Sequence, residues 1–220
     1  MEKLTVTLKT VTPLFLGGAE PNERAEIRAA SIKGAMRFWY RAIDPEYKIN
    51  EPKIFGSTEQ GQARFIIRII SQNILKGIRD EENWNRKKIA YLGFGLINKG
   101  KNTRPYIKSD NEFTIEIIFK PKIKNDERLA VEKSLWALLM FGGLGARSRK
   151  GFGSLMVTDI NSTIFPLLWQ FENADKLKEA IKNFWRTIPK PSGLQEYTRW
   201  SDKSRCIVVD EKKNGETALE

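Results

Sequence analysis

The sequence predicts an α+β protein with a ferredoxin-like (RRM-like) fold. Two observations carry this prediction: segments in which polar and apolar residues alternate, as in strands, and two segments with helical spacing of apolar residues, at 32–43 and 126–141. Their order along the chain is strand, helix, three strands of which one is an insertion, helix and strand. In such folds the helices pack on one face of the sheet, and the other face stays free, often for RNA.

The N-terminal part contains the first strand and the first helix. Residues 3–8 (KLTVTL) alternate and predict a strand, which VTPLFL at 11–16 continues with a bend at Pro13. The polar segment 17–30 predicts a loop, and Ser31 is a suitable N-cap for a helix over 32–43. Pro45 should end this helix at Asp44, because a proline disfavours helical geometry at the residue before it.

The middle of the chain predicts strands joined by loops. A glycine-containing loop at 54–62 leads into 63–71 (ARFIIRIIS), whose β-branched residues indicate a strand. We expect a charged loop with one helical turn at 72–90, a short strand at 91–97 (YLGFGLI) and a basic loop at 99–106. The regular alternation of 111–121 (NEFTIEIIFKP) predicts the next strand.

The C-terminal part completes the fold and adds a tail. Asp126 is a plausible N-cap for the helix over 126–141, and SLMVTDI at 154–160 predicts the last strand. Beyond it, Asn173 should cap a helix at 174–188, PKPSG at 189–193 breaks the chain, and SRCIVVD at 204–210 predicts a strand. We therefore expect a ferredoxin-like domain over 1–160, and over 161–220 a partial second domain or a helical and strand extension. The final ALE resembles a cloning remnant, which leaves open a longer natural chain.

The charge balance favours a polyanionic partner. The net charge is +11, with 38 Lys and Arg against 27 Asp and Glu. A basic surface of this kind favours RNA, DNA or an anionic membrane. The alternative is a solvated surface rich in charges of both signs, as in thermophilic proteins.

The residues that are absent narrow the chemistry. The chain has no histidine and one cysteine, Cys206, so we expect no zinc site, no Ser-His-Asp or Cys-His catalysis and no histidine-based ribonuclease. One cysteine forms no internal disulfide, which suits a reducing cytoplasm. The N-terminus lacks the apolar region of a signal peptide, and no run approaches the roughly 20 apolar residues of a membrane span. We expect a cytoplasmic protein that needs no cofactor or metal.

A glycine-rich basic segment joins the second helix to the last strand. FGGLGARSRKGFGSL at 141–155 contains five glycines and three cations, Arg147, Arg149 and Lys150, with no carboxylate. It does not fit a phosphate-binding P-loop or a dinucleotide fingerprint, because Lys150 precedes Gly151 and the loop enters a strand. Two interpretations stay open: a structural turn, or a cradle whose arginines pair with phosphodiesters. Phe152 would stack on a base or enter the core.

A basic stripe lies on the first predicted helix. Lys33, Arg37 and Arg41 are spaced at i, i+4 and i+8, whereas Ile32, Met36, Trp39 and Ile43 form the side expected to face the sheet. Gly34 destabilises a helix by about 1 kcal/mol relative to alanine, as expected where a ligand approaches the backbone. No acid occurs from 27 to 43, which favours RNA contact over a solvated helix face. Arg24 and Arg28 extend this patch, unless Glu20, Glu23 and Glu26 pair with them.

Three ordered motifs together resemble the RAMP superfamily of CRISPR effector proteins. They are TPLFLGGA at 12–19, SIKGAMRFWYRAI at 31–43 and GGLGARSRKGFGSL at 142–155, and the similarity spans about residues 4–157. Within that superfamily the segment AEIRAASIKGAMRFWYRA most resembles the first-subunit family of type III-B Cmr complexes.

The resemblance implies a non-catalytic subunit of an RNA-guided ribonucleoprotein in antiviral defence. Its implied partners are the CRISPR guide RNA, the target RNA and the other Cmr subunits, with no membrane, near the 3′ portion of the guide. Members of this subunit family usually have two ferredoxin-like units, whereas this chain has room for one and a fragment. The residues that the resemblance assigns to RNA binding are Lys33, Gly34, Arg37, Arg41, Gly142, Gly143, Gly145, Arg147, Arg149, Gly151 and Gly153. Lys150, Arg24 and Arg28 join them by charge and position.

Other functions stay open at this level. A metal-independent endoribonuclease that processes precursor guide RNA would need Lys150 or Tyr40 as acid and base. A two-metal nuclease would use paired acids such as Asp44 with Glu46, or Glu81 with Glu82. A scaffold would use the basic face to bind acidic partner proteins. For an RNA binder, Trp39, Tyr40, Phe94 or Phe152 could add base stacking where exposed.

Overall fold

Four long strands form one antiparallel sheet in the computed structural model, which describes residues 2–73, 76–77, 91–99, 101–161, 168–193 and 200–209. The strands are β1 (Lys3–Thr10), β4 (Phe65–Asn73), β9 (Glu112–Phe119) and β10 (Leu155–Asn161), in the spatial order β10-β1-β9-β4. Every neighbouring pair is antiparallel. The predicted ferredoxin-like topology is confirmed.

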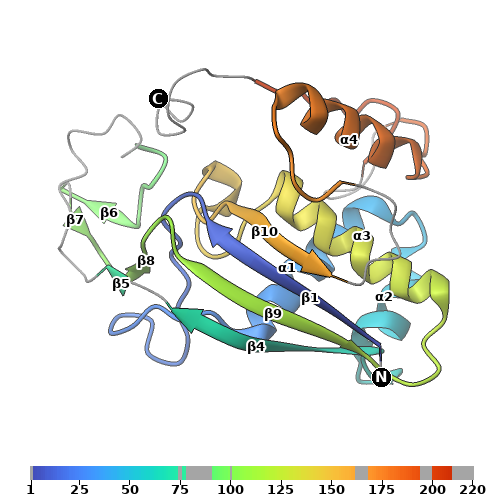
Figure 1. The fold of residues 1–220 in the computed structure, drawn as a ribbon, viewed down its shortest axis with the longest axis horizontal. Coiled ribbons are helices and arrows are strands. Elements are labelled where there is room, and N and C mark those ends of the chain that lie inside the picture. Colours follow the sequence, from blue (N-terminus) through green and yellow to red (C-terminus); the bar gives the residue numbers. More distant parts are fainter. Residues whose placement is uncertain are drawn as a thin grey trace.

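The two long helices, α1 (Ala29–Ile43) and α3 (Asn125–Phe141), cover one face of this sheet (Figure 1). Alternate residues of the strands point toward the helices, and Leu4, Val6 and Leu8 of β1 are at most 1% exposed. Because successive side chains of a strand point to opposite faces, this alternation builds the core that the sequence predicted.

The opposite face of the sheet mixes polar side chains with exposed apolar ones, among them Ile66 and Met156. Thr7 and Thr114 lie side by side on it with their hydroxyl oxygens 3.1 Å apart, and Lys3 pairs with Glu116 at 2.8 Å. The aromatic residues of the four strands, Phe65, Phe113 and Phe119, are all buried at the helical face. An RRM stacks bases on aromatic side chains of its free sheet face, and these strands offer none there. The likeness to an RRM therefore concerns topology and not the binding surface.

A short helix and small hairpins interrupt the ferredoxin-like order. Helix α2 (Tyr47–Phe55) precedes the hairpin of β2 (Gly56–Ser57) and β3 (Gly61–Gln62), and this helix was not predicted. Strands β5 (Lys76–Gly77) and β8 (Tyr106–Ile107) pair, as do β6 (Ile97–Asn98) and β7 (Lys101–Asn102). The strand predicted over 91–97 is wrong, because 91–96 are mostly turns with a single bridge residue, Phe94, and only Ile97 belongs to a strand. Most of the predicted loop at 72–90 lies outside the described residues.

Helix α4 (Ala174–Arg186) packs onto α3 and shares the main hydrophobic core. Phe184 is fully buried and stacks on Trp136 with ring centroids 4.2 Å apart. The predicted cap is confirmed, because the Asn173 side chain accepts a hydrogen bond from the Lys176 backbone N–H at 2.9 Å. Residues 204–209 form no strand, in contrast to the prediction.

Two other predicted caps are wrong. Helix α1 begins at Ala29 with Arg28 at the N-cap, so Ser31 lies inside the helix, whereas Asp44 ends it as predicted. Helix α3 begins at Asn125, and Lys124 takes the N-cap position predicted for Asp126. Of the helices among the described residues, none is both long enough and apolar enough to span a bilayer.

Candidate nucleic-acid interface

The segment 142–153, here called the glycine loop, connects α3 to β10 and contains the short 3-10 helix η3 (Ser148–Lys150). Gly145 and Gly153 have φ of +80° and +66°, a region that L side chains rarely adopt. A Cβ on Gly153 would lie 1.9 Å from the Leu144 carbonyl oxygen, and one on Gly145 would lie 2.4 Å from the Phe15 carbonyl oxygen. Close packing inside the chain therefore requires these two glycines.

Hydrogen bonds fix the glycine loop to the segment that follows β1. The Ala146 N–H donates to the Phe15 carbonyl at 2.9 Å, and the Gly153 N–H donates to the Pro13 carbonyl at 3.0 Å. The Thr12 hydroxyl donates to the Gly151 carbonyl at 2.6 Å. The glycine loop is thus a structural turn, and it can present its side chains in a fixed arrangement.

Phe152 belongs to a second, smaller core. It is 3% exposed and packs with Phe15, Leu96, Ile97 and Tyr106. Its ring meets the Phe15 ring edge-on, with centroids 5.8 Å apart. Of the two roles open for Phe152, the structure therefore shows the core role.

The three cations of the glycine loop lie outside this packing. Arg149 and Lys150 are exposed in η3, and neither has a carboxylate within ion-pair distance in the part of the chain that the structure describes. Arg147 has φ of +61°, and its Nη2 donates to the Phe94 carbonyl oxygen. The loop therefore offers a polyanion two unneutralised cations and a third guanidinium that is held in place.

The basic stripe of α1 has a different electrostatic environment. Glu51 of α2 is 7% exposed and accepts two hydrogen bonds from Arg41, from Nε and, at 2.8 Å, from Nη2. Arg37 Nε lies 3.2 Å from the same carboxylate, and Arg37 Nη2 donates to the carbonyls of Phe55 and Gly56 at 3.0 and 2.6 Å. Two of the three cations of the stripe therefore fasten α2 to α1.

Replacing Glu51 by glutamine should lower stability by about 1–2 kcal/mol, because an acceptor shared by two arginines loses its charge. Urea unfolding measures this. RNA affinity should change by less than about twofold if Arg37 and Arg41 serve the α1–α2 contact, whereas several-fold tighter binding would assign these cations to RNA. Glu179→Gln, on the exposed face of α4, gives the same charge change as a control.

Lys33 and Gly34 remain accessible at the N-terminal end of the stripe. Lys33 Nζ lies 5.5 Å from the centroid of the Phe65 ring and shares a hollow of about 350 Å³ with Lys120. Burial, Arg37 and Lys120 lower the pKa of Lys33 below its usual value. A Cβ on Gly34 would meet nothing within 4 Å, so no contact among the described residues explains this glycine.

The structure does not bring the stripe and the glycine loop together. A Cβ on Gly142 would lie 2.3 Å from Trp39 Nε1, so the loop begins against Trp39. At about 100° per residue, Trp39 lies about 200° around α1 from both Arg37 and Arg41. Helix α1 therefore separates the two cationic groups. Trp39 is half-buried, with its ring centroid 5.9 Å from that of Phe141.

Arg24 and Arg28 have acidic neighbours. Arg24 Nε lies 3.2 Å from Glu20 and 3.7 Å from Glu26, and Arg28 Nε lies 3.6 Å from Glu26. These pairs are exposed and weak, so a stronger anion can compete for the arginines.

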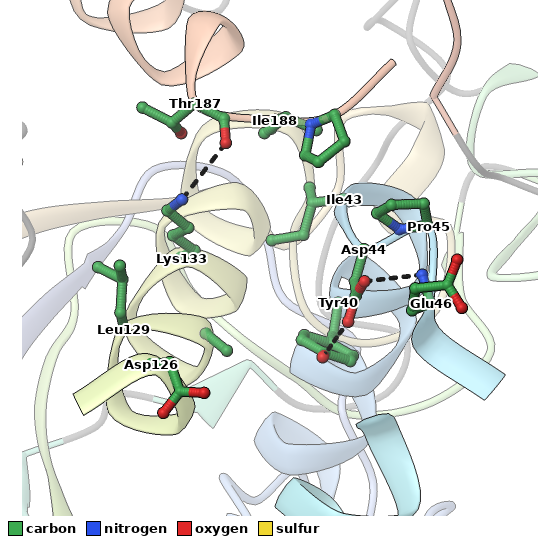
Figure 2. A pocket seen from close by; sticks show the side chains of 12 residues that line it. Tyr40, Ile43, Asp44, Pro45, Glu46, Asp126, Leu129, Lys133, Thr187 and Ile188 are labelled. Carbon is green, nitrogen blue, oxygen red and sulfur yellow. Dashed lines mark hydrogen bonds between the residues drawn. The ribbon is translucent and has the colours of Figure 1, made fainter. Parts of the chain in front are cut away.

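A cavity of about 380 Å³ lies between the end of α1, the start of α3 and the residues after α4 (Figure 2). It holds Tyr40, Asp44 and Glu46, which the nuclease alternatives invoke. The Tyr40 hydroxyl donates to Asp44 Oδ2, and Asp44 also accepts the Glu46 backbone N–H at 2.8 Å. Burial, and then the hydrogen bond to Asp44, raise the pKa of Tyr40 well above its usual value. A tyrosine in this state is poorly suited to exchange protons near neutral pH.

Lys133 lies across the same cavity, and its Nζ donates to the Thr187 carbonyl oxygen at 3.5 Å (Figure 2). Burial lowers its pKa below the usual value. Within the described ranges, no three Asp, Glu, Cys or His side chains gather closely enough to hold a metal ion. Glu81 and Glu82, the other predicted acidic pair, lie outside those ranges.

These observations define a class of protein: a ferredoxin-like domain whose last helix and last strand are joined by a cationic, glycine-rich loop. The family model of the RAMP superfamily matches residues 7–156, and the chain belongs to this superfamily.

Its relatives include two Cmr subunits of Pyrococcus furiosus. The chain is 32% identical to CRISPR system Cmr subunit Cmr1-2 over 179 residues, which cover 68% of this chain and 92% of that protein. It is 29% identical to Cmr subunit Cmr1-1 over 188 residues, which cover 80% of this chain and 54% of that protein. The predicted resemblance is confirmed: the chain is a homologue of Cmr1 subunits and spans about half the length of Cmr1-1.

Solved structures of Cmr proteins have a similar fold. The crystal structure of Cmr1 from Pyrococcus furiosus in its apo form matches with a TM-score of 0.67 and 25% identity, covering 88% of this chain and 63% of that chain. A chain in the cryo-EM structure of Type III-B Cmr-beta bound to cognate target RNA matches with a TM-score of 0.58 and 16% identity. The match covers 83% of this chain and 61% of that chain. The latter likeness concerns the fold alone.

Proposed function

We propose that this chain is a non-catalytic, RNA-binding subunit of a type III-B CRISPR ribonucleoprotein, and that the glycine loop contacts guide or target RNA. Homology to Cmr1-2 over 92% of that protein supports a place in such a complex. The observation that carries RNA binding is the exposed pair Arg149 and Lys150, which lacks carboxylate partners among the described residues.

The physical basis is pairing with phosphates. Arginine and lysine displace counterions from the RNA backbone, and this supplies affinity that does not depend on sequence. The hydrogen bonds of the glycine loop fix the backbone that carries the cations before RNA binds, which lowers the backbone entropy lost on binding. Lys33, Gly34, Arg37 and Arg41, with Arg24 and Arg28, form a second proposed contact on the other side of α1.

Titration of unstructured single-stranded RNA at several salt concentrations tests this function. Each phosphate contact contributes a slope of about −0.7 to a plot of log affinity against log salt, so two or three contacts of the glycine loop alone predict roughly −1.4 to −2.1, and the second proposed contact makes the slope steeper. Affinity should be similar for RNAs of different sequence. Affinity that does not change with salt would contradict the proposal.

The alternative of a metal-independent endoribonuclease has weaker support. Tyr40 is engaged by Asp44 and its pKa is raised, and Lys150 is exposed to water, which leaves neither with the usual activation of a general base. Labelled CRISPR repeat RNA incubated with the protein and a chelator should stay intact. Defined cleavage products that Tyr40→Phe or Lys150→Ala abolishes would assign the enzyme function instead.

We also propose that residues 161–220 act as an extension of the first domain. Trp169, Ile181 and Phe184 are buried in the main hydrophobic core, next to residues of α1 and α3. A segment whose apolar side chains complete the core of the preceding domain is expected to unfold together with it. A single unfolding transition of the whole chain, seen by circular dichroism and by tryptophan fluorescence, is the expected result.

A further inference from the structure

We propose that Phe94 is a base-stacking residue of the RNA site, so that the glycine loop and the turn before β6 together bind one unpaired nucleotide. This inference rests on the proposed RNA binding. It adds a ligand class, a nucleobase exposed in single-stranded RNA, to a site so far described by phosphate contacts alone.

The first observation is the exposure of the Phe94 ring, 74% of which is accessible to solvent. Its neighbours in the same turn are buried, with Leu96 at 2% and Ile97 at 9% exposed in the second core. Single exposed apolar residues are common, but Tyr91, three residues before Phe94, is also 86% exposed. Two aromatic rings therefore point outward from this turn, while its residues Leu96 and Ile97 are buried in the second core.

The second observation is that the backbone of this turn is held in place. The Leu96 and Ile97 N–H groups both donate to the Gly93 carbonyl, at 2.8 and 3.0 Å. A Cβ on Gly93 would lie 2.4 Å from Ile97 Cδ1 and 3.2 Å from Phe152 Cζ, so the turn lies directly against the second core. A ring on such a turn loses little conformational freedom when a base stacks on it.

The third observation joins Phe94 to the cations. Arg147 Nη2 donates to the Phe94 carbonyl oxygen, and a Cβ on Gly95 would lie 3.5 Å from that same nitrogen. The glycine loop and the aromatic turn are therefore in direct contact, although they lie 53 residues apart in sequence. A phosphate bound by the glycine loop would place the base of its nucleotide within reach of the ring.

The chemistry of this surface favours a nucleotide over a protein partner. An exposed aromatic ring beside unneutralised cations matches the base and the phosphate of one residue of single-stranded nucleic acid. Stacking of this kind tolerates every base, because each base presents a π-face. The proposal thus agrees with binding that does not read sequence.

The test is a double-mutant cycle between the ring and the base. One partner is Phe94→Leu, which keeps an apolar side chain and removes the aromatic ring, and the other is an oligouridine compared with the same backbone made abasic. Wild type should bind oligouridine roughly 5- to 150-fold more tightly than Phe94→Leu does, the range for loss of one stacked base. For the abasic backbone the two proteins should bind equally, because the removed ring then has no partner.

Four comparisons complete the design. Phe94→Trp should keep the wild-type affinity, and Ile49→Ala, an exposed apolar residue of α2, should leave it unchanged. The salt dependence of Phe94→Leu should equal that of wild type, since no phosphate contact is lost. Thermal unfolding of Phe94→Leu should match wild type, because an exposed ring contributes little to stability.

The outcomes separate the two proposals. Equal affinity of wild type and Phe94→Leu for oligouridine, with binding lost in an Arg149→Glu/Lys150→Glu variant, overturns the stacking role and leaves the proposed function standing. Absence of RNA binding by wild type overturns both. Loss of binding to the abasic backbone in Phe94→Leu would show a structural role for the ring and also overturn the proposal. Loss of association with another complex subunit at unchanged RNA affinity would assign Phe94 to a protein interface.

Discussion

Replacing both Arg149 and Lys150 by glutamate should weaken binding of single-stranded RNA by roughly 10- to 100-fold at low salt. Two favourable phosphate contacts would be lost, and two negative charges would face the RNA backbone. The plot of log affinity against log salt should also become shallower by about 1.4, since each contact contributes about 0.7. Fluorescence anisotropy of a labelled oligonucleotide measures both quantities.

A matched control separates these local contacts from the net charge of the chain. Lys178→Glu with Lys182→Glu changes two exposed cations of α4 and lowers the net charge by the same amount. At about 0.15 M salt, where the Debye length is about 8 Å, this control should lower RNA affinity by less than about threefold, because exposed charges outside the contact are largely screened. If both double variants lose RNA affinity equally, the affinity depends on the net charge of the chain and not on local contacts of the glycine loop.

Replacing Gly153 by alanine should destabilise the fold by roughly 3 kcal/mol or more. The new methyl group would lie 1.9 Å from the Leu144 carbonyl oxygen, and the backbone φ of +66° is unfavourable for alanine. For a chain of this size, a loss of this size lowers Tm by about 10 °C, which circular dichroism can follow.

Gly34→Ala is the matched control, because it makes the same chemical change where nothing lies within 4 Å. It should raise stability by up to about 1 kcal/mol, as alanine favours the helix. If the Gly153→Ala protein melts at the wild-type temperature, the backbone of the glycine loop can shift to accommodate the methyl group. That result would contradict the conclusion that close packing requires a glycine at this position.

The topology could be predicted because it depends on local patterns. The alternation in 112–119 and in 3–10 is visible residue by residue, and burial follows it on both strands. Helix α2 was missed because it contains Pro52, which usually ends helices, and has almost no amphipathic pattern. Without that helix, Glu51 had no predicted position, and the two arginines that it binds looked unpaired.

The position of the glycine loop between a helix and a strand could also be read from the sequence. The role of its glycines could not, because Gly145 and Gly153 pack against backbone atoms of Phe15 and Leu144. Likewise, the exposure of Phe94 depends on how the turn folds over the second core, and the sequence suggested a strand there. Two glycines within seven residues, Gly93 and Gly95, were the available signal of a turn.

The bonds between the glycine loop and the segment after β1 have a consequence for the order of folding. Thr12 and Gly151 lie 139 residues apart, so this contact is among the slowest to form by chain diffusion. It also requires β10 to emerge from the ribosome and pair with β1. An incomplete nascent chain therefore lacks the ordered glycine loop, and the proposed RNA binding would begin only after β10 has paired with β1.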